Sequence, residues 1–380
     1  MATRRTQYLN TRFAVVATFI LGVTFFASGN SVQATTISSP SFDLDGANSS
    51  SLAVSSPTVW KDLVSNTTQL TILANTSRSS EGGGSLQVSS GNGAQGTQSG
   101  SSGAYLAPSA VGSAYNPSGD MTIMLWIKPT SWNSDWNIFA SRWFIDLAGT
   151  GGASDYHFSI KSTTSGGAVH KLNLYTTSAS EMWGNYDFAL NKWYLVGFTL
   201  TASGNMQMYV NGQPDGAVRT NSGHTATNTS YLFVGDGRSG NNCWTCSMNG
   251  YIGKFRIWNS VLTASQVAGD YRNEAGSFGY ASSLTLSLAS NSPQYRISNT
   301  ITATISGPTN NAGKITFFEN GKTIVGCKNK VTSTSTTTCA WKPSRHGVTT
   351  ISASYTPSDI TFLSGATSSS YIVKARTNNR

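Results

Sequence analysis

Short apolar runs bounded by turn residues recur along this chain and constrain its fold more than any other feature. Met121–Ile127 is a continuous apolar run, and Trp193–Leu200 is a second one of similar length. A third run, Met206–Val210, is followed by Asn211-Gly212, a pair that favours the positive φ angles of a tight hairpin turn. Runs of this length separated by turns are typical of β-strands. The sequence therefore predicts an all-β protein.

Composition excludes two other classes of protein. Ten Trp and an aromatic content of 11 % are too high for a disordered chain. Ala, Leu, Glu and Lys are too sparse for a coiled coil or another long-helix protein. One short helix is predicted where Thr263 and Gln266 form a capping box.

Residues 1–34 have the pattern of an export signal. Basic residues near the start precede Phe13–Ala27, an apolar run without a charge, and Val32-Gln33-Ala34 supplies a small-x-small cleavage pattern. The alternative is that the segment is retained as an anchor, although spanning a bilayer takes about 20 apolar residues. The sequence predicts a protein that is secreted or held at a cell surface, with no transmembrane segment after cleavage.

The sequence changes character near Ala281, where we expect one domain, residues 35–280, to give way to a second, residues 281–380. The second has about seven short predicted strands, the number in an immunoglobulin-like sandwich. It carries ten Lys and Arg against two acidic residues. This balance predicts contact with a polyanion such as a wall polymer, an acidic glycan or lipid head groups. A merely solvated basic surface is the alternative, and an exported protein is not expected to bind nucleic acid.

The four cysteines all follow the signal, and an even number in an exported chain predicts disulfides. Local pairing gives Cys243–Cys246 and Cys327–Cys339, and we expect the second bond to join neighbouring strands or the strands of a hairpin rather than to span two sheets. For Cys243 and Cys246 two alternatives remain open. A redox C-x-x-C stands at a helix start in a βαβ unit, and a zinc site needs further ligands at close spacing.

Five motifs in order resemble the laminin-G-like, concanavalin A-like lectin/glucanase jelly roll of secreted and surface proteins. They lie within residues 41–275 and end in a closing strand and helix. The motifs are Leu44–Asn48 with Val59–Leu63, Met121–Pro129, Asn191–Val196, Met208–Gly212, and Asn249–Asn259 with Leu262–Tyr271. The resemblance implies a jelly-roll sandwich. Ile315–Gly321 and Ile351–Tyr355 more loosely resemble bacterial immunoglobulin-like repeats.

One departure from the family bears on cofactors. Many relatives bind calcium through acidic residues at the rim, but the matching stretch here, Ser102–Leu106, lacks the acid. Asp236 with Asn241 and Asn242 could still supply oxygen ligands, and ordinary loop residues are the alternative. We expect no cofactor, with calcium left open.

Catalysis is not expected. The glucanases of this fold carry a short E-x-D-x-x-E strand, and none of the four glutamates has an Asp two positions later. A serine nucleophile elbow is also missing. Remote acid pairs such as Glu181 with Asp187 are not excluded by the sequence.

Binding is the function class that the residues favour. Sugar rings stack on aromatic faces, and their hydroxyls bond to Asn, Asp and Gln. Trp126, Trp193 and Trp258 lie in predicted strands and are assigned to the core. The candidate ligand contacts are the loop residues Trp132, Trp136, Trp183, Asp236 and Trp244. Trp244 lies between two cysteines, where a disulfide would fix its loop, and the alternative is that it only covers that disulfide.

The sequence as a whole predicts a non-catalytic carbohydrate-binding or adhesion protein whose partner is a glycan or surface polymer. Two other hypotheses stay open. The first is a structural surface protein with protein contacts only, and the second is a glycoside hydrolase.

Overall fold

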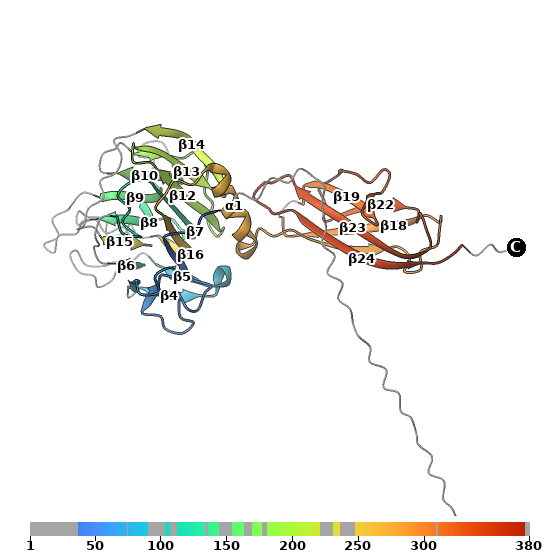
Figure 1. The fold of residues 1–380 in the computed structure, drawn as a ribbon, viewed down its shortest axis with the longest axis horizontal. Helices are drawn as coiled ribbons and strands as arrows, with labels where there is room; N and C mark the ends of the chain where they lie inside the picture. Colours follow the sequence, from blue (N-terminus) through green and yellow to red (C-terminus); the bar gives the residue numbers. More distant parts are fainter. Residues whose placement is uncertain are drawn as a thin grey trace, which may run out of the picture. The chain divides into compact units, whose positions relative to one another are not determined.

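The computed structural model describes residues 37–73, 75–89, 103–106, 112–133, 136–143, 154–162, 169–176, 181–220, 231–235, 248–308 and 311–376, with 136–143 and 154–155 described by their backbone alone. Within these residues the chain is all-β, as predicted, apart from one α-helix and two 3₁₀ helices (Figure 1). The expected signal segment, residues 1–34, lies outside the described residues.

The first sheet has eight strands in the order β14-β13-β12-β7-β16-β5-β4, with β1 paired to β16. Its strands are β1 (Phe42–Asp45), β4 (Thr76–Ser79), β5 (Ser85–Val88), β7 (Met121–Ser131), β12 (Tyr194–Leu200), β13 (Asn205–Val210), β14 (Gln213–Thr220) and β16 (Asn249–Trp258). The predicted hairpin between β13 and β14 is confirmed, since Asn211 and Gly212 have φ angles of 49° and 78°.

The second sheet also has eight strands, in the order β11-β10-β9-β8-β15-β6-β3-β2. Its strands are β2 (Val59–Lys61), β3 (Gln69–Ile72), β6 (Ala104–Leu106), β8 (Trp136–Trp143), β9 (Ser154–Lys161), β10 (Lys171–Thr176), β11 (Met182–Trp183) and β15 (Tyr231–Val234). All pairings in both sheets are antiparallel among the described strands.

The main core lies between these two sheets and is filled by alternate residues of their strands. Ile123 and Leu125 of β7 and Phe198 of β12 meet Phe158 of β9 and Leu174 of β10 in one buried cluster. Phe158 and Phe198 contact edge to face, with their ring centroids 5.1 Å apart. Because successive side chains of a strand point to opposite faces, the same strands present a second set of residues to the outside of the sandwich.

On the outer face of the first sheet, that second set is covered by helix α1 (Ala264–Glu274) and the 3₁₀ turn η2 (Ala275–Phe278). The predicted capping box is confirmed, with Thr263 accepting the Gln266 N–H and Gln266 accepting the Thr263 N–H. Trp126 stacks on Phe278, with ring centroids 4.1 Å apart. Trp126, Trp193 and Trp258 are buried as predicted, but they lie under the helix and not between the sheets. The rings of these three tryptophans are therefore closed to a ligand.

A buried ion-pair cluster ties the helix to β16. Arg256 bonds both carboxylate oxygens of Asp270, at 2.6 and 2.9 Å, and one oxygen of Glu274 at 2.7 Å. Lys254 adds bonds of 2.9 Å to Glu274 and to Asp45 of β1. Trp126 Nε1 also donates to Glu274 Oε2 (2.7 Å), the carboxylate oxygen that Arg256 bonds.

Residues beyond 281 form two more sheets with a hydrophobic cluster of their own. One has the order β17-β18-β22, and the other β20-β19-β23-β24 with β21 paired to β19. Their bounds are β17 (Ser283–Leu288), β18 (Asn299–Ser306), β19 (Gly313–Glu319), β20 (Lys322–Thr323), β21 (Lys330–Thr332), β22 (Thr336–Trp341), β23 (Gly347–Pro357) and β24 (Gly365–Val373). The immunoglobulin-like assignment and the boundary near Ala281 stay predictions.

The Cys327–Cys339 disulfide is confirmed, but the expected placement of the bond is wrong. Cys339 lies in β22 of the three-stranded sheet, with its Cα 5.7 Å from that of Cys327. Cys327 follows β20, and its carbonyl accepts the N–H of Phe317 in β19 of the other sheet (3.0 Å). The bond therefore connects the two sheets across their core, and both sulfurs belong to the buried cluster.

The Gly- and Ser-rich composition of residues 75–103 predicts a long surface loop with a weak strand at Leu86–Val88, and the structure has two strands in its first part. Thr76–Ser79 and Ser85–Val88 pair as β4 and β5, with the short 3₁₀ turn η1 (Glu81–Gly83) between them. Apolar Leu86 and Val88 are buried in the main core. Their burial favours pairing at the sheet edge over the loop conformation that composition alone suggests.

Candidate functional site

The outer face of the second sheet carries polar side chains near its β11 edge. In β9 and β10, Ile160 and Leu172 point into the core, and their neighbours in sequence therefore point away from it. The register pairs Ser159 with Asn173, Lys161 with Lys171, and Asn173 with Trp183. We call these five outward residues the Trp183 face: Ser159, Lys161, Lys171, Asn173 and Trp183.

Trp183 is held in place by the loop that follows β11. The N–H of Gly184 donates to Leu172 of β10 (2.9 Å), and Asp215 Oδ1 accepts the N–H groups of Asn185 and Tyr186 at 2.7 and 2.9 Å. A Cβ atom at position 184 would lie 2.1 Å from Asp215 Oδ2. Only glycine therefore lets the loop approach Asp215 so closely.

Two lysines bring positive charge to the face. Lys161 Nζ lies 5.5 Å from the centre of the Trp183 ring, a cation–π distance. Lys171 Nζ donates to the carbonyl of Asn185 (2.6 Å) and pairs with the exposed carboxylate of Asp187 (2.5 Å). Trp183 itself is partly exposed, whereas Lys161 is buried.

Two buried polar side chains on this face lack hydrogen bonds. Asn173 and Ser159 are each 0 % exposed. Within the described part of the chain, neither amide atom of Asn173 nor the hydroxyl of Ser159 has a hydrogen-bond partner. A buried polar group without a partner costs about 1–3 kcal/mol, and each such group in a folded protein calls for an explanation. A sugar supplies hydroxyls that both donate and accept, which matches what an amide lacks.

Trp132 has a structural contact. Its ring stacks on His170 with centroids 4.4 Å apart and an interplanar angle of 18°, and it packs against the main core. Burial lowers the pKa of His170 below its usual value, although the Asp187 carboxylate acts in the opposite direction. The imidazole that stacks on Trp132 is therefore neutral at pH 7. Trp132 itself packs at the end of the sandwich.

The structure describes only some of the other residues that the sequence predicts as ligand contacts. Trp136 and Trp183 were expected in loops, which is wrong, because they belong to β8 and β11. The backbone of Trp136 pairs with Lys161, at the Trp183 face, and its side chain is outside the description. Trp244, Asp236 and the Cys243–Cys246 pair lie outside the described residues.

Lys161, Asn173 and Ser159 were not singled out by sequence reasoning. The signal for them was present in the alternation of Tyr156–Lys161 and Lys171–Thr176, where polar residues occupy every second position. That pattern identifies an outward face, but the register that brings Asn173 beside Trp183 comes from the structure.

Metal and membrane features can be reported only for the part of the chain that is described. There, no three His, Cys, Asp or Glu side chains are grouped so as to hold a metal ion. The calcium ligands suggested by the sequence, Asp236, Asn241 and Asn242, fall outside it. No helix in the described part is long and apolar enough to cross a membrane.

Two buried groups of the sandwich titrate in opposite directions. Burial raises the pKa of Asp43 from 3.8 to about 6, so the folded state holds a proton that the unfolded state has lost. The contribution of Asp43 to the free energy of unfolding therefore falls as pH rises from about 4 to about 6. Burial, helped by Lys161, lowers the pKa of His157 from 6.5 to about 4. Stability from His157 therefore falls as pH decreases from about 6.5 to about 4.

We expect these two contributions to separate in single variants. Relative to the parent protein, Asp43→Asn should gain unfolding free energy as pH rises from 4 to 6, by about 2 kcal/mol. His157→Gln should gain relative stability in the other direction, as pH falls from 6.5 to 4. Urea unfolding at four or five pH values measures both, and parallel pH profiles for the parent and either variant would disprove the assignment for that residue.

Comparison with known proteins agrees with this fold. Residues 98–268 match the model of a family described as the concanavalin A-like lectin/glucanases superfamily, and the whole Trp183 face lies within the matched stretch. No curated protein matches the chain in sequence.

Several solved structures resemble the chain at low identity. Trypanosoma rangeli sialidase is 16 % identical with a TM-score of 0.43, covering 60 % of this chain and 32 % of its own. Domain 4 of AbnA, a GH43 extracellular arabinanase from Geobacillus stearothermophilus, was solved in complex with arabinotriose. It is 17 % identical with a TM-score of 0.43, and the match covers 62 % of this chain and 99 % of the AbnA domain. The binding domain of Paraclostridial Mosquitocidal Protein 1 is 12 % identical with a TM-score of 0.45, covering 82 % and 74 %. The chain thus spans about a third of the sialidase's length.

Proposed function

We propose that this protein is an exported, non-catalytic carbohydrate-binding protein that recognises a glycan through the Trp183 face. The observation that carries the proposal is the pairing of a partly exposed tryptophan with a buried amide that lacks hydrogen-bond partners, on the outward side of a concanavalin A-like sheet. On the outer face of the first sheet, α1 and η2 cover Trp126, Trp193 and Trp258.

The proposed contact divides into an apolar and a polar part. Lys161 lies over one face of the Trp183 indole, and a sugar ring stacks on the other face. A sugar hydroxyl then supplies the missing partner of Asn173. Because Asn173 is fully buried, this second contact requires the atoms that cover it to move aside on binding.

Two glutamates of the described sandwich are held in ion pairs, which favours binding over hydrolysis at their positions. Glu274 is bonded to Arg256 and Lys254, and Glu81 to Lys128 at 2.8 Å. A retaining glycosidase needs two carboxyl groups about 5 Å apart beside the sugar, one of them able to give up a proton. Carboxylates held in ion pairs by cations are poor proton donors.

Trp183→Ala tests the proposal directly. A glycan array probed with the purified protein selects the ligand, and titration calorimetry then compares variants. We expect Trp183→Ala to weaken binding by about tenfold or more, equivalent to about 1.4 kcal/mol, because the stacking surface is lost. Trp183→Phe, which keeps an aromatic ring, should retain most of the affinity.

Unfolding curves for both variants provide the control for folding. Silence across the array would favour a structural protein with protein contacts only. Release of reducing ends from the selected glycan would contradict the non-catalytic assignment. Equal binding by the parent protein and Trp183→Ala would move the site to another face.

A further inference from the structure

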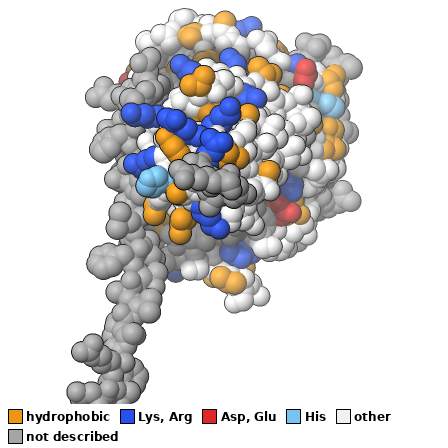
Figure 2. Space-filling view, turned by 90° about the vertical axis from the view of Figure 1, so that its right-hand side faces the viewer, with side chains coloured by type: hydrophobic (Ala, Val, Ile, Leu, Met, Phe, Trp, Pro, Cys, Tyr) orange, Lys and Arg blue, Asp and Glu red, His pale blue; other side chains and the backbone are white. Residues whose placement is uncertain are grey.

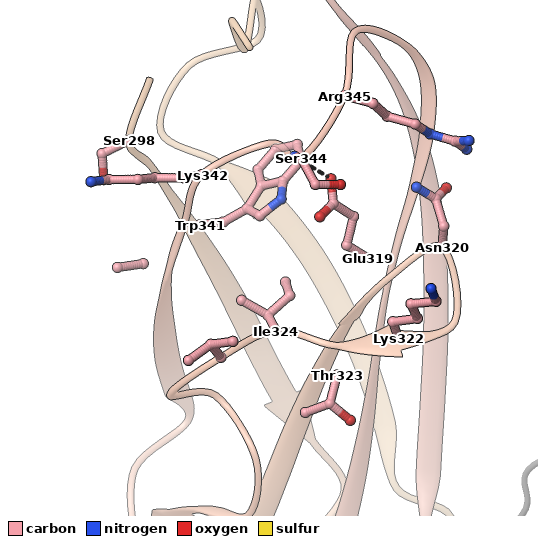
Figure 3. A pocket seen from close by; sticks show the side chains of 12 residues that line it. Ser298, Glu319, Asn320, Lys322, Thr323, Ile324, Trp341, Lys342, Ser344 and Arg345 are labelled. Carbon is pink, nitrogen blue, oxygen red and sulfur yellow. Dashed lines mark hydrogen bonds between the residues drawn. The ribbon is translucent and has the colours of Figure 1, made fainter. Parts of the chain in front are cut away.

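A cavity lies at one end of the sandwich formed by residues 283–373. It has a volume of about 850 Å³ and opens between the β19–β20 hairpin and the loop after β22 (Figure 3). We call it the C-terminal cleft and follow six of its lining residues: Glu319, Lys322, Trp341, Lys342, Ser344 and Arg345. Pockets of about 300–1,000 Å³ are of the size that holds small ligands.

The cleft is lined by more cations than its own acid can neutralise. Lys322, Lys342 and Arg345 are exposed, and within the described residues none of them forms an ion pair. The single acid of the lining, Glu319, accepts a hydrogen bond from the N–H of Ser344 at 3.0 Å. Unpaired cations on the walls of a cleft concentrate field lines and attract anions.

The surroundings of the cleft are also basic. Arg296 donates its N–H to Pro343, beside the cleft, and the N–H of Tyr295 donates to the carbonyl of Lys374. Arg296 and Lys374 are both exposed, and Arg296 lies 5.0 Å from the Tyr295 ring centre. The space-filling view shows Lys and Arg side chains gathered among hydrophobic ones, with few acidic side chains between them (Figure 2).

Trp341 adds a polar donor that has no partner. Its side chain is 1 % exposed, and its Nε1 atom, buried as well, has no hydrogen-bond acceptor. Figure 3 shows this nitrogen turned toward the side of the cleft where Glu319 lies. An unpaired indole N–H needs an oxygen acceptor, and the neighbouring Glu319 carboxylate accepts hydroxyl protons. The cleft thus offers a donor and an acceptor between positive walls.

We propose that the C-terminal cleft binds a segment of an acidic polysaccharide, a chain that carries both carboxylate or sulfate groups and free hydroxyls. Lys322, Lys342 and Arg345 bind the anionic groups, Glu319 accepts from a hydroxyl, and Trp341 Nε1 donates to a ring or hydroxyl oxygen. Nucleic acid fits less well, because its phosphates would face Glu319. Single strands also need exposed aromatic rings for base stacking, and Trp341 is buried.

A matched pair of double variants tests the site. Lys342→Gln/Arg345→Gln removes two cations of the cleft, while Lys314→Gln/Lys328→Gln removes two exposed cations elsewhere in the same pair of sheets. The probes are polygalacturonate oligomers, neutral dextran oligomers of the same length and single-stranded DNA. We expect polygalacturonate to bind the parent protein, and we expect this binding to weaken with added salt. The cleft variant should bind polygalacturonate with about tenfold lower affinity, whereas the matched control should lose less than about threefold.

Three results would overturn the proposal. Equal losses of affinity in the two double variants would mean that the ligand binds a diffuse basic surface and not a defined site. Single-stranded DNA binding as tightly as polygalacturonate, with the same sensitivity to the cleft variant, would indicate a nucleic-acid site. Absence of polygalacturonate binding would exclude an acidic sugar chain as the ligand of the cleft. Both double variants keep Trp183, so the comparison between them is independent of the proposed Trp183 face.

Discussion

Replacing Arg256 with alanine should lower the free energy of unfolding of the concanavalin A-like sandwich by about 3–5 kcal/mol. The guanidinium makes three hydrogen bonds to Asp270 and Glu274, and its side chain is only 7 % exposed. Without it, two acidic groups remain buried beside one another with Lys254 as their nearest cation. Loss of a partner from a buried ion pair costs far more than an exposed pair ever contributes.

The matched control is Arg272→Ala. Arg272 lies in the last turn of α1, the helix that carries Asp270 and Glu274, and it has the same charge as Arg256, but its side chain is exposed. We expect this change to lower the free energy of unfolding by less than about 0.5 kcal/mol. Urea unfolding followed by tryptophan fluorescence measures both variants, since Trp126 contacts the cluster through Glu274. Similar losses in the two variants would mean that the cluster does not hold the helix to the sheet.

The second large effect is expected at the Cys327–Cys339 bond. The double change Cys327→Ala/Cys339→Ala should destabilise the C-terminal pair of sheets by about 3 kcal/mol, because a closed loop of 12 residues restricts the unfolded chain by about that amount. The bond also links the two sheets across their shared core, so its removal loosens their packing.

Reduction provides the control for this prediction. Reductant should destabilise the parent protein to a similar extent and leave the double variant unchanged. A double variant that unfolds at the same urea concentration as the parent would show that the packing of the two sheets does not depend on the bond.

Local signals in the sequence were sufficient for most of the fold. The apolar run of β7, the Asn211-Gly212 turn and the Thr263–Gln266 capping box each involve residues close in the chain, and each is confirmed. The stacking of Trp126 under Phe278 was not predictable, because these residues are distant in the chain and meet only when the helix folds back on the sheet.

The candidate site was less accessible to sequence reasoning for the same physical reason. Trp183 was selected as an aromatic residue among polar neighbours, but its place in an edge strand depends on pairing with Asn173. The register of a sheet is fixed by long-range pairing and core packing. The span of the Cys327–Cys339 bond across two sheets likewise depends on how those sheets stack.

The most direct test of the account is a crystal structure of the protein with the oligosaccharide that the array selects. The account predicts a sugar ring stacked on Trp183, with a hydroxyl within about 3 Å of the Asn173 amide. A sugar bound elsewhere on the sandwich, with Asn173 and Ser159 still without partners, would contradict it.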